Sequence, residues 1–302
     1  MHRIILLGVG TYIRIRQVTV GLTHQEEDVW LYLRLHIMLR ILIDQRLDLR
    51  FLISVRFFDR IQVVIVQKAV WEAAQTEHGV IVQDTAWDGY EEIPSWIMQG
   101  YGTMANEAAD QLRQCSVNRP THVFVQAGVG SLAGAVVGYF ANLFPNDPPK
   151  FVVMEAGAAD CLYQGALAND GKPRIVTGDL KTIMAGLACG EPNTISWDIL
   201  RNHVSAFISC PDWVSAKGMR MLSSPVKGDP RVVSGESGAV GMGVLDAIMC
   251  DDTYKELRDA LELDRHSRVL MFSTEGNTDP EKYRRVVWDG EYPTDDTPQK
   301  PC

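Results

Sequence analysis

Short apolar runs alternate with longer amphipathic segments from about residue 69 onward. The short runs predict buried strands and the longer segments predict helices. Strands that alternate with helices of about ten or more residues are typical of the α/β class, a mostly parallel sheet with helices on both faces. The predicted strands cover residues 80–84, 121–126, 150–156, 206–210 and 268–273. The predicted helices cover residues 94–115, 131–144, 160–167, 212–222 and 238–249.

The first 68 residues differ in composition from the rest of the chain. They hold nine arginines but no alanine and no proline, whereas all 14 prolines and all the alanines follow them. Between residues 30 and 67, apolar residues recur without the glycine, proline or asparagine that normally separates elements. Two interpretations are open: amphipathic helices that form an interaction module, or a stretch translated from another reading frame. We favour the second, and divide the chain into an atypical arginine-rich segment, 1–68, and an α/β domain, 69–302.

Composition and charge narrow the class of protein. The apolar share of 46% and the charged share of 22% are those of a soluble globular protein. The net charge of −9 argues against a broad surface for nucleic acid or anionic membrane, because such surfaces are basic. No apolar run reaches the roughly 18 residues of a membrane span, and the six cysteines include no Cys-x-x-Cys pair. We expect a cytoplasmic protein with no nucleic-acid, membrane or metal partner.

Residues 126–140, QAGVGSLAGAVVGYF, hold four glycines between a predicted strand and a predicted helix. Glycine lets the backbone approach a ligand and adopt positive φ, and the first turn of a helix offers unpaired N–H groups. Gly128–Ser131 therefore predicts a cradle for an anion, most naturally a phosphate. It lacks the Lys-Ser/Thr ending of a nucleotide P-loop, and Ala133 replaces the third glycine of a dinucleotide motif. A dinucleotide, a nucleotide and a phosphorylated cofactor stay open, as does the simpler interpretation that Gly134 and Gly138 only permit close helix packing.

Five motifs, in the same order, resemble those of the diaminopropionate ammonia-lyases, which belong to the fold-type II pyridoxal-phosphate (PLP) enzymes. The resemblance runs from about residue 69 to about residue 290. It implies a lyase that converts a small amino acid, 2,3-diaminopropionate, to pyruvate and ammonia by α,β-elimination. It also implies PLP as cofactor, a large domain of fold type II and a homodimer. The motifs are VQDTAWDGYEEIPSWIMQGYGTMANE (82–107), PTHVFVQAGVGSLAG (120–134), IMAGLACGEPN (183–193), VSGESGAVG (233–241) and STEGNTD (273–279).

The resemblance assigns roles to three groups of residues. Asp84 matches an aspartate that acts as a base on the substrate α-carbon, a step that a carboxylate with a raised pKa suits. Ser273 and Thr274 end the last strand, where the family places a hydroxyl against the pyridine nitrogen. Without the resemblance, a turn cap is the simpler role for Asp84, and an ordinary turn is simpler for the two hydroxyl residues. The residues that match the loop gripping the PLP phosphate are Gly128, Val129, Gly130, Ser131 and Leu132.

Four further residues match family motifs without a firm role. Glu155 and Glu236 are acidic, and a position at the surface or behind the site fits them equally well. Cys161 and Cys189 match positions that could pair in the family, although two free thiols fit a cytosolic chain better.

The lysine that carries PLP as a Schiff base in the family has no counterpart here. The family places it before the motif of Asp84, in a sequence like Asn-Ala-Phe-Lys, and an asparagine-containing loop follows it; neither occurs in this chain. Lys68 is the only lysine before Lys150, and it lies in a helical context, IVQKAVWEAA. Three hypotheses follow: a lyase by descent with little or no activity, a catalytically empty module that binds PLP or phosphate for a partner, or a non-functional translation product.

Overall fold

A five-stranded parallel sheet forms the centre of the structure, a computed structural model that describes residues 5–8 and 82–294. The order of the strands across the sheet is β1-β5-β2-β3-β4. The strands are β1 (Ile5–Gly8), β2 (His122–Gln126), β3 (Lys150–Ala156), β4 (Val204–Cys210) and β5 (Val269–Ser273). The helices are α4 (Glu92–Gln114), α5 (Ser131–Leu143), α6 (Cys161–Ala168), α7 (Thr194–His203), α8 (Asp212–Ser223), α9 (Glu236–Cys250), α10 (Lys255–Leu261) and α11 (Pro280–Val287), with short 3₁₀ turns η1 (Ala185–Leu187) and η2 (Asp252–Tyr254).

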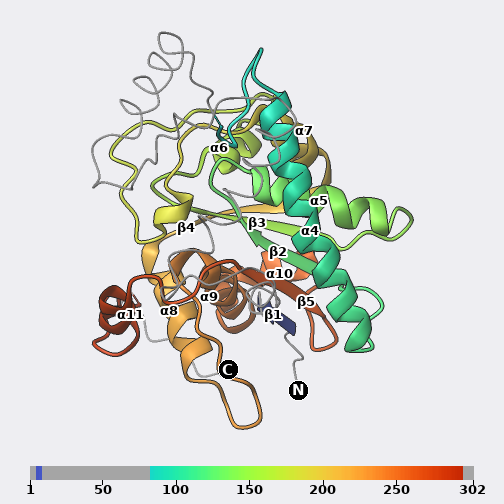
Figure 1. Cartoon of the computed structure of the whole chain (residues 1–302). Helices are drawn as coiled ribbons and strands as arrows, with labels where there is room; N and C mark the ends of the chain where they lie inside the picture. Colours follow the sequence, from blue (N-terminus) through green and yellow to red (C-terminus); the bar gives the residue numbers. More distant parts are fainter. Residues whose placement is uncertain (1–4, 9–81, 295–302) are drawn as a thin grey trace, which may run out of the picture.

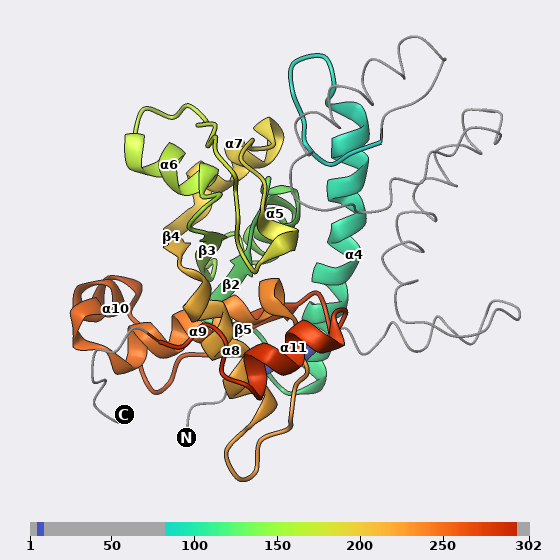
Figure 2. The same ribbon diagram turned by 90° about the vertical axis from the view of Figure 1, so that its left-hand side faces the viewer.

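Helices cover both faces of the sheet (Figures 1 and 2). Successive strand residues point to opposite faces, so each central strand contributes to two separate hydrophobic clusters. In β2, Val123 and Val125 belong to the cluster formed with α4, α5 and α7, whereas Phe124 belongs to the cluster formed with α8 and α9. The residues of β3 and β5 alternate in the same way. Because both faces are buried, these strands are almost continuously apolar, as parallel strands usually are.

The structure confirms the α/β class, the five predicted helices and four of the five predicted strands, with small shifts at their ends. The predicted strand at 80–84 is wrong for its described residues, 82–84, which are irregular. The Gln83 amide donates to the Tyr90 hydroxyl at 3.1 Å instead of to a neighbouring strand. An apolar run alone does not reveal whether a partner strand lies beside it, which is why the pattern misled here. Residues 80 and 81 lie outside the described part.

Helices α7, α10 and α11 are not among the helices predicted from the sequence. The start of α7 carries a clear signal, because the Asn193 Oδ1 accepts hydrogen bonds from the amides of Ile195 (2.9 Å) and Ser196 (3.1 Å). Asparagine is among the best residues at this capping position. The helix was therefore readable from the sequence.

Residues 1–68 enter the described structure only through β1, whose backbone pairs with β5 at the edge of the sheet. The predictions for the remainder of this segment concern residues outside the described part. Among the helices of the described part, none has the length and apolar character that crossing a membrane requires.

Helices α5 and α7 pack closely where Gly134 faces Ser196. A Cβ atom at Gly134 would lie 2.7 Å from the Ser196 Cβ and 3.2 Å from the Met98 Cε, closer than carbon atoms normally approach. At Gly138 the nearest atom, the Ile199 Cγ2, would be 3.7 Å away, which is ordinary contact. The close-packing interpretation therefore holds for Gly134 and not for Gly138.

Gly134→Ala should destabilise the fold, whereas Gly138→Ala on the same helix should not. The first substitution pushes α5 away from α7, and overpacking of this kind costs about 1–3 kcal/mol. The second keeps the packing and gains about 0.5–1 kcal/mol from the lower conformational freedom of alanine in the unfolded chain. Urea unfolding followed by circular dichroism measures both free energies. Equal effects of the two substitutions would contradict the close contact at Gly134.

Candidate active site

The loops after β2 and β5 meet at the carboxyl edge of the sheet because the two strands are neighbours. Ligands of open parallel sheets bind at this edge. The buried side chain of Gln126, the last residue of β2, donates from Nε2 to the Phe272 carbonyl and to the Thr274 hydroxyl, both at 2.9 Å. It thereby joins the predicted phosphate loop to the predicted hydroxyls. Sequence reasoning missed Gln126, although a polar residue ending a buried strand is a usable signal.

Gly130 turns the chain from β2 into α5. Its φ of 99° and ψ of −6° lie in the left-handed region, where a side chain is strained. A Cβ atom there would also lie 2.8 Å from the Ser196 Oγ. Gly130 precedes Ser131, the first residue of α5, and offers no side chain to cap the helix. The structure thus confirms that Gly128–Ser131 lies between a strand end and a helix start.

The N-terminal end of α5 is open, in contrast to three nearby helices. The amides that begin α6, α9 and α7 are bound by the side chains of Glu155, Glu275 and Asn193, respectively. Among the residues that the structure describes, no side chain accepts a hydrogen bond from the amides of residues 131–133. These amides and the positive end of the helix dipole are therefore available to an anionic ligand.

The segment 182–189 lies against the glycine-rich loop. A Cβ atom at Gly128 would be 3.3 Å from the Gly186 carbonyl oxygen and 3.5 Å from the Cys189 Sγ. Just beyond this segment, the Asn193 amide donates to the Val129 carbonyl at 2.7 Å. The loop is therefore fixed from outside as well as by the sheet, and a Cβ atom at position 128 would make this contact tighter than usual.

Asp84 lies beside the phosphate loop. Its carbonyl oxygen accepts hydrogen bonds from the Ser131 hydroxyl and from the Asn193 Nδ2, each at 2.6 Å. Its carboxylate contributes to raising the pKa of Cys189 and of Tyr90, after the larger effect of burial on each. The structure thus brings the predicted base and the predicted phosphate loop together, although they are far apart in the sequence.

The two predicted hydroxyls at the end of β5 have different partners. The Ser273 hydroxyl donates to the Ser234 Oγ at 2.9 Å, just before α9. The Thr274 Oγ1 accepts from Gln126, so its own hydrogen remains for a further acceptor. Glu275 shapes the turn, because its carbonyl accepts from the Gly235 amide at 3.1 Å. Thr274 is therefore better placed than Ser273 to donate to a ligand.

Residues 55–275, more than half of the chain, match the family of pyridoxal-phosphate dependent enzymes. The chain belongs to this family. The diaminopropionate ammonia-lyase of Salmonella typhimurium is 53% identical over 218 residues, which are 72% of this chain and 54% of that protein. The structure of the holo enzyme from Escherichia coli has a TM-score of 0.70 and 47% identity over 76% of this chain and 56% of that one. The E. coli enzyme with an aminoacrylate-PLP azomethine reaction intermediate has a TM-score of 0.68 and 47% identity, over 74% and 56% of the two chains.

These matches confirm the resemblance to diaminopropionate ammonia-lyases and the fold-type II architecture. The chain spans about half the length of the relatives it matches. The site residues fit the phosphate of PLP, since a phosphate only accepts hydrogen bonds and carries negative charge. The open amides of residues 131–133 offer donors, and the missing Cβ at Gly130 lets the loop come close.

Glu155, at the carboxyl end of β3, lies fully inside the protein and not at its surface. Its carboxylate accepts hydrogen bonds from the amides of Leu162 (2.9 Å) and Tyr163 (2.7 Å). Burial raises its pKa to about 8, although the two amides oppose the rise. Glu155 therefore caps α6 and positions the loop that leads into it.

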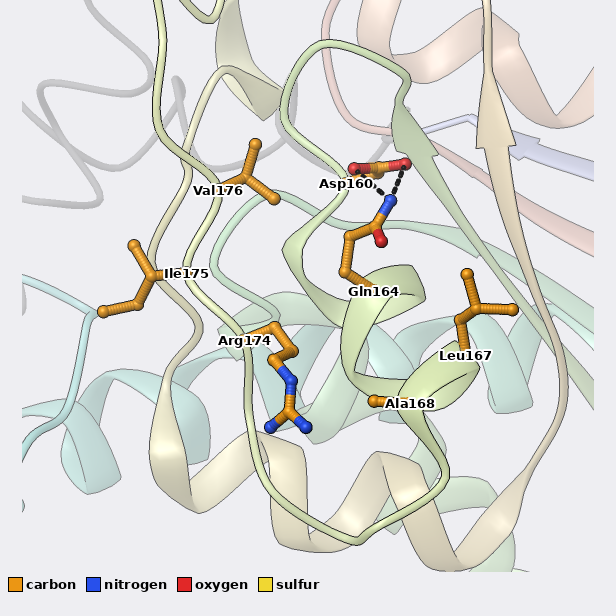
Figure 3. A pocket seen from close by; sticks show the side chains of 7 residues that line it. All are labelled: Asp160, Gln164, Leu167, Ala168, Arg174, Ile175 and Val176. Atoms are coloured by element: carbon orange, nitrogen blue, oxygen red, sulfur yellow. Dashed lines mark hydrogen bonds between the residues drawn. The ribbon is translucent and has the colours of Figure 1, made fainter.

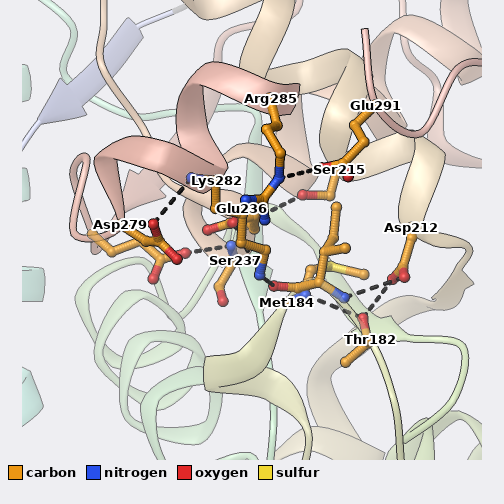
Figure 4. A network of polar contacts seen from close by, with 12 residues as sticks. Thr182, Met184, Asp212, Ser215, Glu236, Ser237, Asp279, Lys282, Arg285 and Glu291 are labelled. Carbon is orange, nitrogen blue, oxygen red and sulfur yellow. Dashed lines mark hydrogen bonds and ion pairs between the residues drawn. The ribbon is translucent and has the colours of Figure 1, made fainter. Parts of the chain in front are cut away.

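Glu236, the first residue of α9, forms an ion pair with Lys282 of α11, with 3.2 Å between Oε1 and Nζ (Figure 4). Lys282 also donates to the Ile183 carbonyl at 3.1 Å. Asp212, at the start of α8, accepts from the Ile183 amide at 3.2 Å and from a neighbouring threonine hydroxyl. Residues of α8, α9 and α11 thus hold the segment 182–189 in place. The Lys282 ammonium is already bound by Glu236 and by the Ile183 carbonyl.

Cys161 and Cys189 are free thiols, as expected. The Cys161 Sγ lies 3.7 Å from the Cys189 carbonyl oxygen. Burial raises the pKa of Cys189 to about 11 and that of Cys161 further. Both thiols are therefore protonated near neutral pH and weakly nucleophilic.

A separate cavity of about 470 Å³ lies between α6 and the segment 174–176 (Figure 3). None of the predicted site residues lines it, so we do not assign the cofactor to it. Its walls are formed by Asp160, Gln164, Leu167, Ala168, Arg174, Ile175 and Val176.

Glu155 should make the protein less stable as the pH rises. Its pKa is about 8 in the folded state and ordinarily 4.5, so the folded protein keeps a proton that the unfolded chain releases between these values. The free energy of unfolding of the wild type, relative to that of Glu155→Gln, should therefore fall across this range, by roughly 5 kcal/mol. Denaturant unfolding at a series of pH values measures the difference. The exposed control Glu256→Gln should show no such trend, and a parallel pH dependence of wild type and Glu155→Gln would contradict the assignment.

Proposed function

We propose that this chain carries the cofactor-binding part of a PLP-dependent ammonia-lyase that splits 2,3-diaminopropionate into pyruvate and ammonia. The observation that carries the proposal is the open N-terminal end of α5 behind Gly130, at the carboxyl edge of a parallel sheet. The matched relatives, which are named diaminopropionate ammonia-lyases, support the choice of substrate. A complex of the E. coli enzyme with D-serine supports a small amino acid at the site.

At the phosphate end, Gly128, Val129, Gly130, Ser131 and Leu132 form the cradle. The donors are main-chain amides, because the single hydrogen of the Ser131 hydroxyl is directed to the Asp84 carbonyl. The open helix end supplies a positive partial charge of about half an elementary charge. The loop therefore recognises a phosphate by backbone geometry and needs no basic side chain.

At the ring end, Thr274 would donate its hydroxyl hydrogen to the pyridine nitrogen, since its oxygen already accepts from Gln126, and Ser273 holds the turn through Ser234. PLP acts as an electron sink that makes the substrate α-proton acidic. Asp84 takes this proton as a general base, a role that its place beside Ser131 supports.

The covalent lysine is the missing part of this site. Lys68 is the only lysine before Lys150, and its sequence context does not resemble the family motif. Without a covalent bond, PLP would be held mainly by the phosphate loop and by packing of its ring. A second candidate function follows from this observation: a PLP- or phosphate-binding module without turnover, in which residues 69–302 form the binding domain and 1–68 an atypical segment whose β1 pairs with β5 at the edge of the sheet.

We also propose that the protein is a cytoplasmic homodimer without nucleic-acid or membrane partners. The acidic net charge of −9 supports the absence of a nucleic-acid surface.

Gly130→Ala should abolish PLP binding, whereas Gly228→Ala should leave it intact. The two glycines have similar φ angles, +99° and +105°, so alanine strains the backbone at both. Only at position 130 does the new Cβ also press against Ser196 and displace the loop, because the space around Gly228 is open. An absorbance titration with PLP measures the affinity, with pyridoxal as the ligand that lacks phosphate. Binding that survives Gly130→Ala would contradict the cradle.

This chain should form no stable covalent adduct with PLP and should release no pyruvate. General acid–base help alone is worth about 100- to 10,000-fold in rate, and the loss of the lysine costs at least this much. Borohydride reduction with PLP, followed by peptide mass mapping, should find no adduct or only sub-stoichiometric adducts on scattered surface lysines. A stoichiometric adduct on Lys68, together with pyruvate release from diaminopropionate, would show that residues 1–68 complete the site.

A further inference from the structure

We propose that Asn193 is a positioning residue that locks the phosphate loop and the Asp84 segment into one arrangement. The proposal rests on the function proposed above and adds a residue to it that no motif match assigns to the site. Asn193 itself reaches neither cofactor nor substrate in this account. It acts through Ser131, Val129 and Asp84.

Every polar group of Asn193 that faces the site is used. The main-chain amide donates to the Val129 carbonyl at 2.7 Å. The side-chain Nδ2 donates to the Asp84 carbonyl at 2.6 Å and to the Ser131 Oγ at 2.9 Å. One residue therefore contacts the phosphate loop twice and the Asp84 segment once.

The oxygen of the Asn193 side-chain amide fixes the orientation of this group. The Oδ1 accepts hydrogen bonds from the amides of Ile195 and Ser196, at 2.9 Å and 3.1 Å. An amide flipped by half a turn would place two donors against these amides and an acceptor against the Asp84 carbonyl. Only one orientation satisfies all four contacts, and a fully buried asparagine cannot turn to water for others.

The Asn193 Nδ2, the Ser131 Oγ and the Asp84 carbonyl form a closed triangle of hydrogen bonds. Because Ser131 accepts from Asn193, its single hydrogen is free to go to Asp84, where it is donated at 2.6 Å. Asp84 and Ser131 are separated by 47 residues, and Asn193 by a further 62. The triangle is thus a long-range link, and a shift of the loop must disturb the backbone of Asp84.

A helix cap alone does not require asparagine. Aspartate and serine cap helices about as well, because a cap needs only an acceptor. Asparagine is the residue that accepts toward α7 and donates twice toward the site at the same time. Substitutions can therefore separate the two roles: Asn193→Asp and Asn193→Ser keep an acceptor for α7 and lose the paired donors.

The experiment compares wild type, Asn193→Ser and Asn193→Asp with the control Asn202→Ser, on the exposed face of the same helix. Hydrogen–deuterium exchange is followed in peptides that cover residues 84–90, 128–133 and 194–200, and PLP affinity is titrated in parallel. For both Asn193 variants we expect faster exchange at 84–90 and at 128–133 together, little change at 194–200, and PLP affinity reduced about tenfold. Asn202→Ser should change neither quantity.

Ser131→Ala provides a second route that leaves the α7 cap untouched. It removes the middle of the triangle, so it should also loosen residues 84–90, and adding Asn193→Ser should change the exchange there by less than the sum of the two single effects. Faster exchange at 194–200 alone in the Asn193 variants, or additive effects in the double variant, would overturn the proposal and leave Asn193 as a helix cap. Hydrogen–deuterium exchange can be measured without the cofactor. If wild type binds no PLP, but the Asn193 variants still exchange faster at 84–90 and 128–133 together, the result contradicts the proposed function and supports the positioning role.

Discussion

The structure depends on a backbone constraint at the end of β2, where the chain must turn directly into α5 through a residue without a side chain. Gly130 has a φ of 99°, and the space that a Cβ would occupy is filled by the Ser196 hydroxyl. Any other residue would strain the turn and push α5 away from α7. This turn leaves the first amides of α5 without a capping side chain, at the sheet edge where β2 and β5 lie side by side.

Around this edge, described side chains bind the first amides of α6, α7 and α9 but not those of α5. The carboxyls of Glu155, which is fully buried, and Glu275, which is partly buried, bind the first amides of α6 and α9. Burial raises the pKa of both carboxyls, because the charged form of each loses solvation inside the protein. With α6, α7 and α9 capped by described side chains, the first amides of α5 are the donors that we propose for an anionic ligand.

The sequence was sufficient for β2, the loop at 128–131 and α5, because an alternating apolar run, closely spaced glycines and a small-residue helix follow one another directly. It also led to Asp84, Ser273 and Thr274, through motifs long enough to identify a family. It was not sufficient for Gln126 and Asn193, whose importance lies in contacts across 146 and 109 residues of sequence. Such contacts follow from strand order, which periodicity does not encode. For the same reason the apolar run at 80–84 predicts a strand that its described residues do not form, and the burial of the Glu155 carboxylate follows from the packing of β3 against α6, which the sequence alone does not show.

Amide chemical shifts test most directly whether the open end of α5 holds the phosphate of PLP. Isotope-labelled protein would be titrated with PLP, with inorganic phosphate and with pyridoxal, and the amides of residues 128–133 followed by NMR. We expect these amides to shift with PLP and with phosphate, because a phosphate accepts hydrogen bonds from them, and to stay in place with pyridoxal. Shifts confined to other parts of the molecule, or equal shifts with PLP and pyridoxal, would contradict the account.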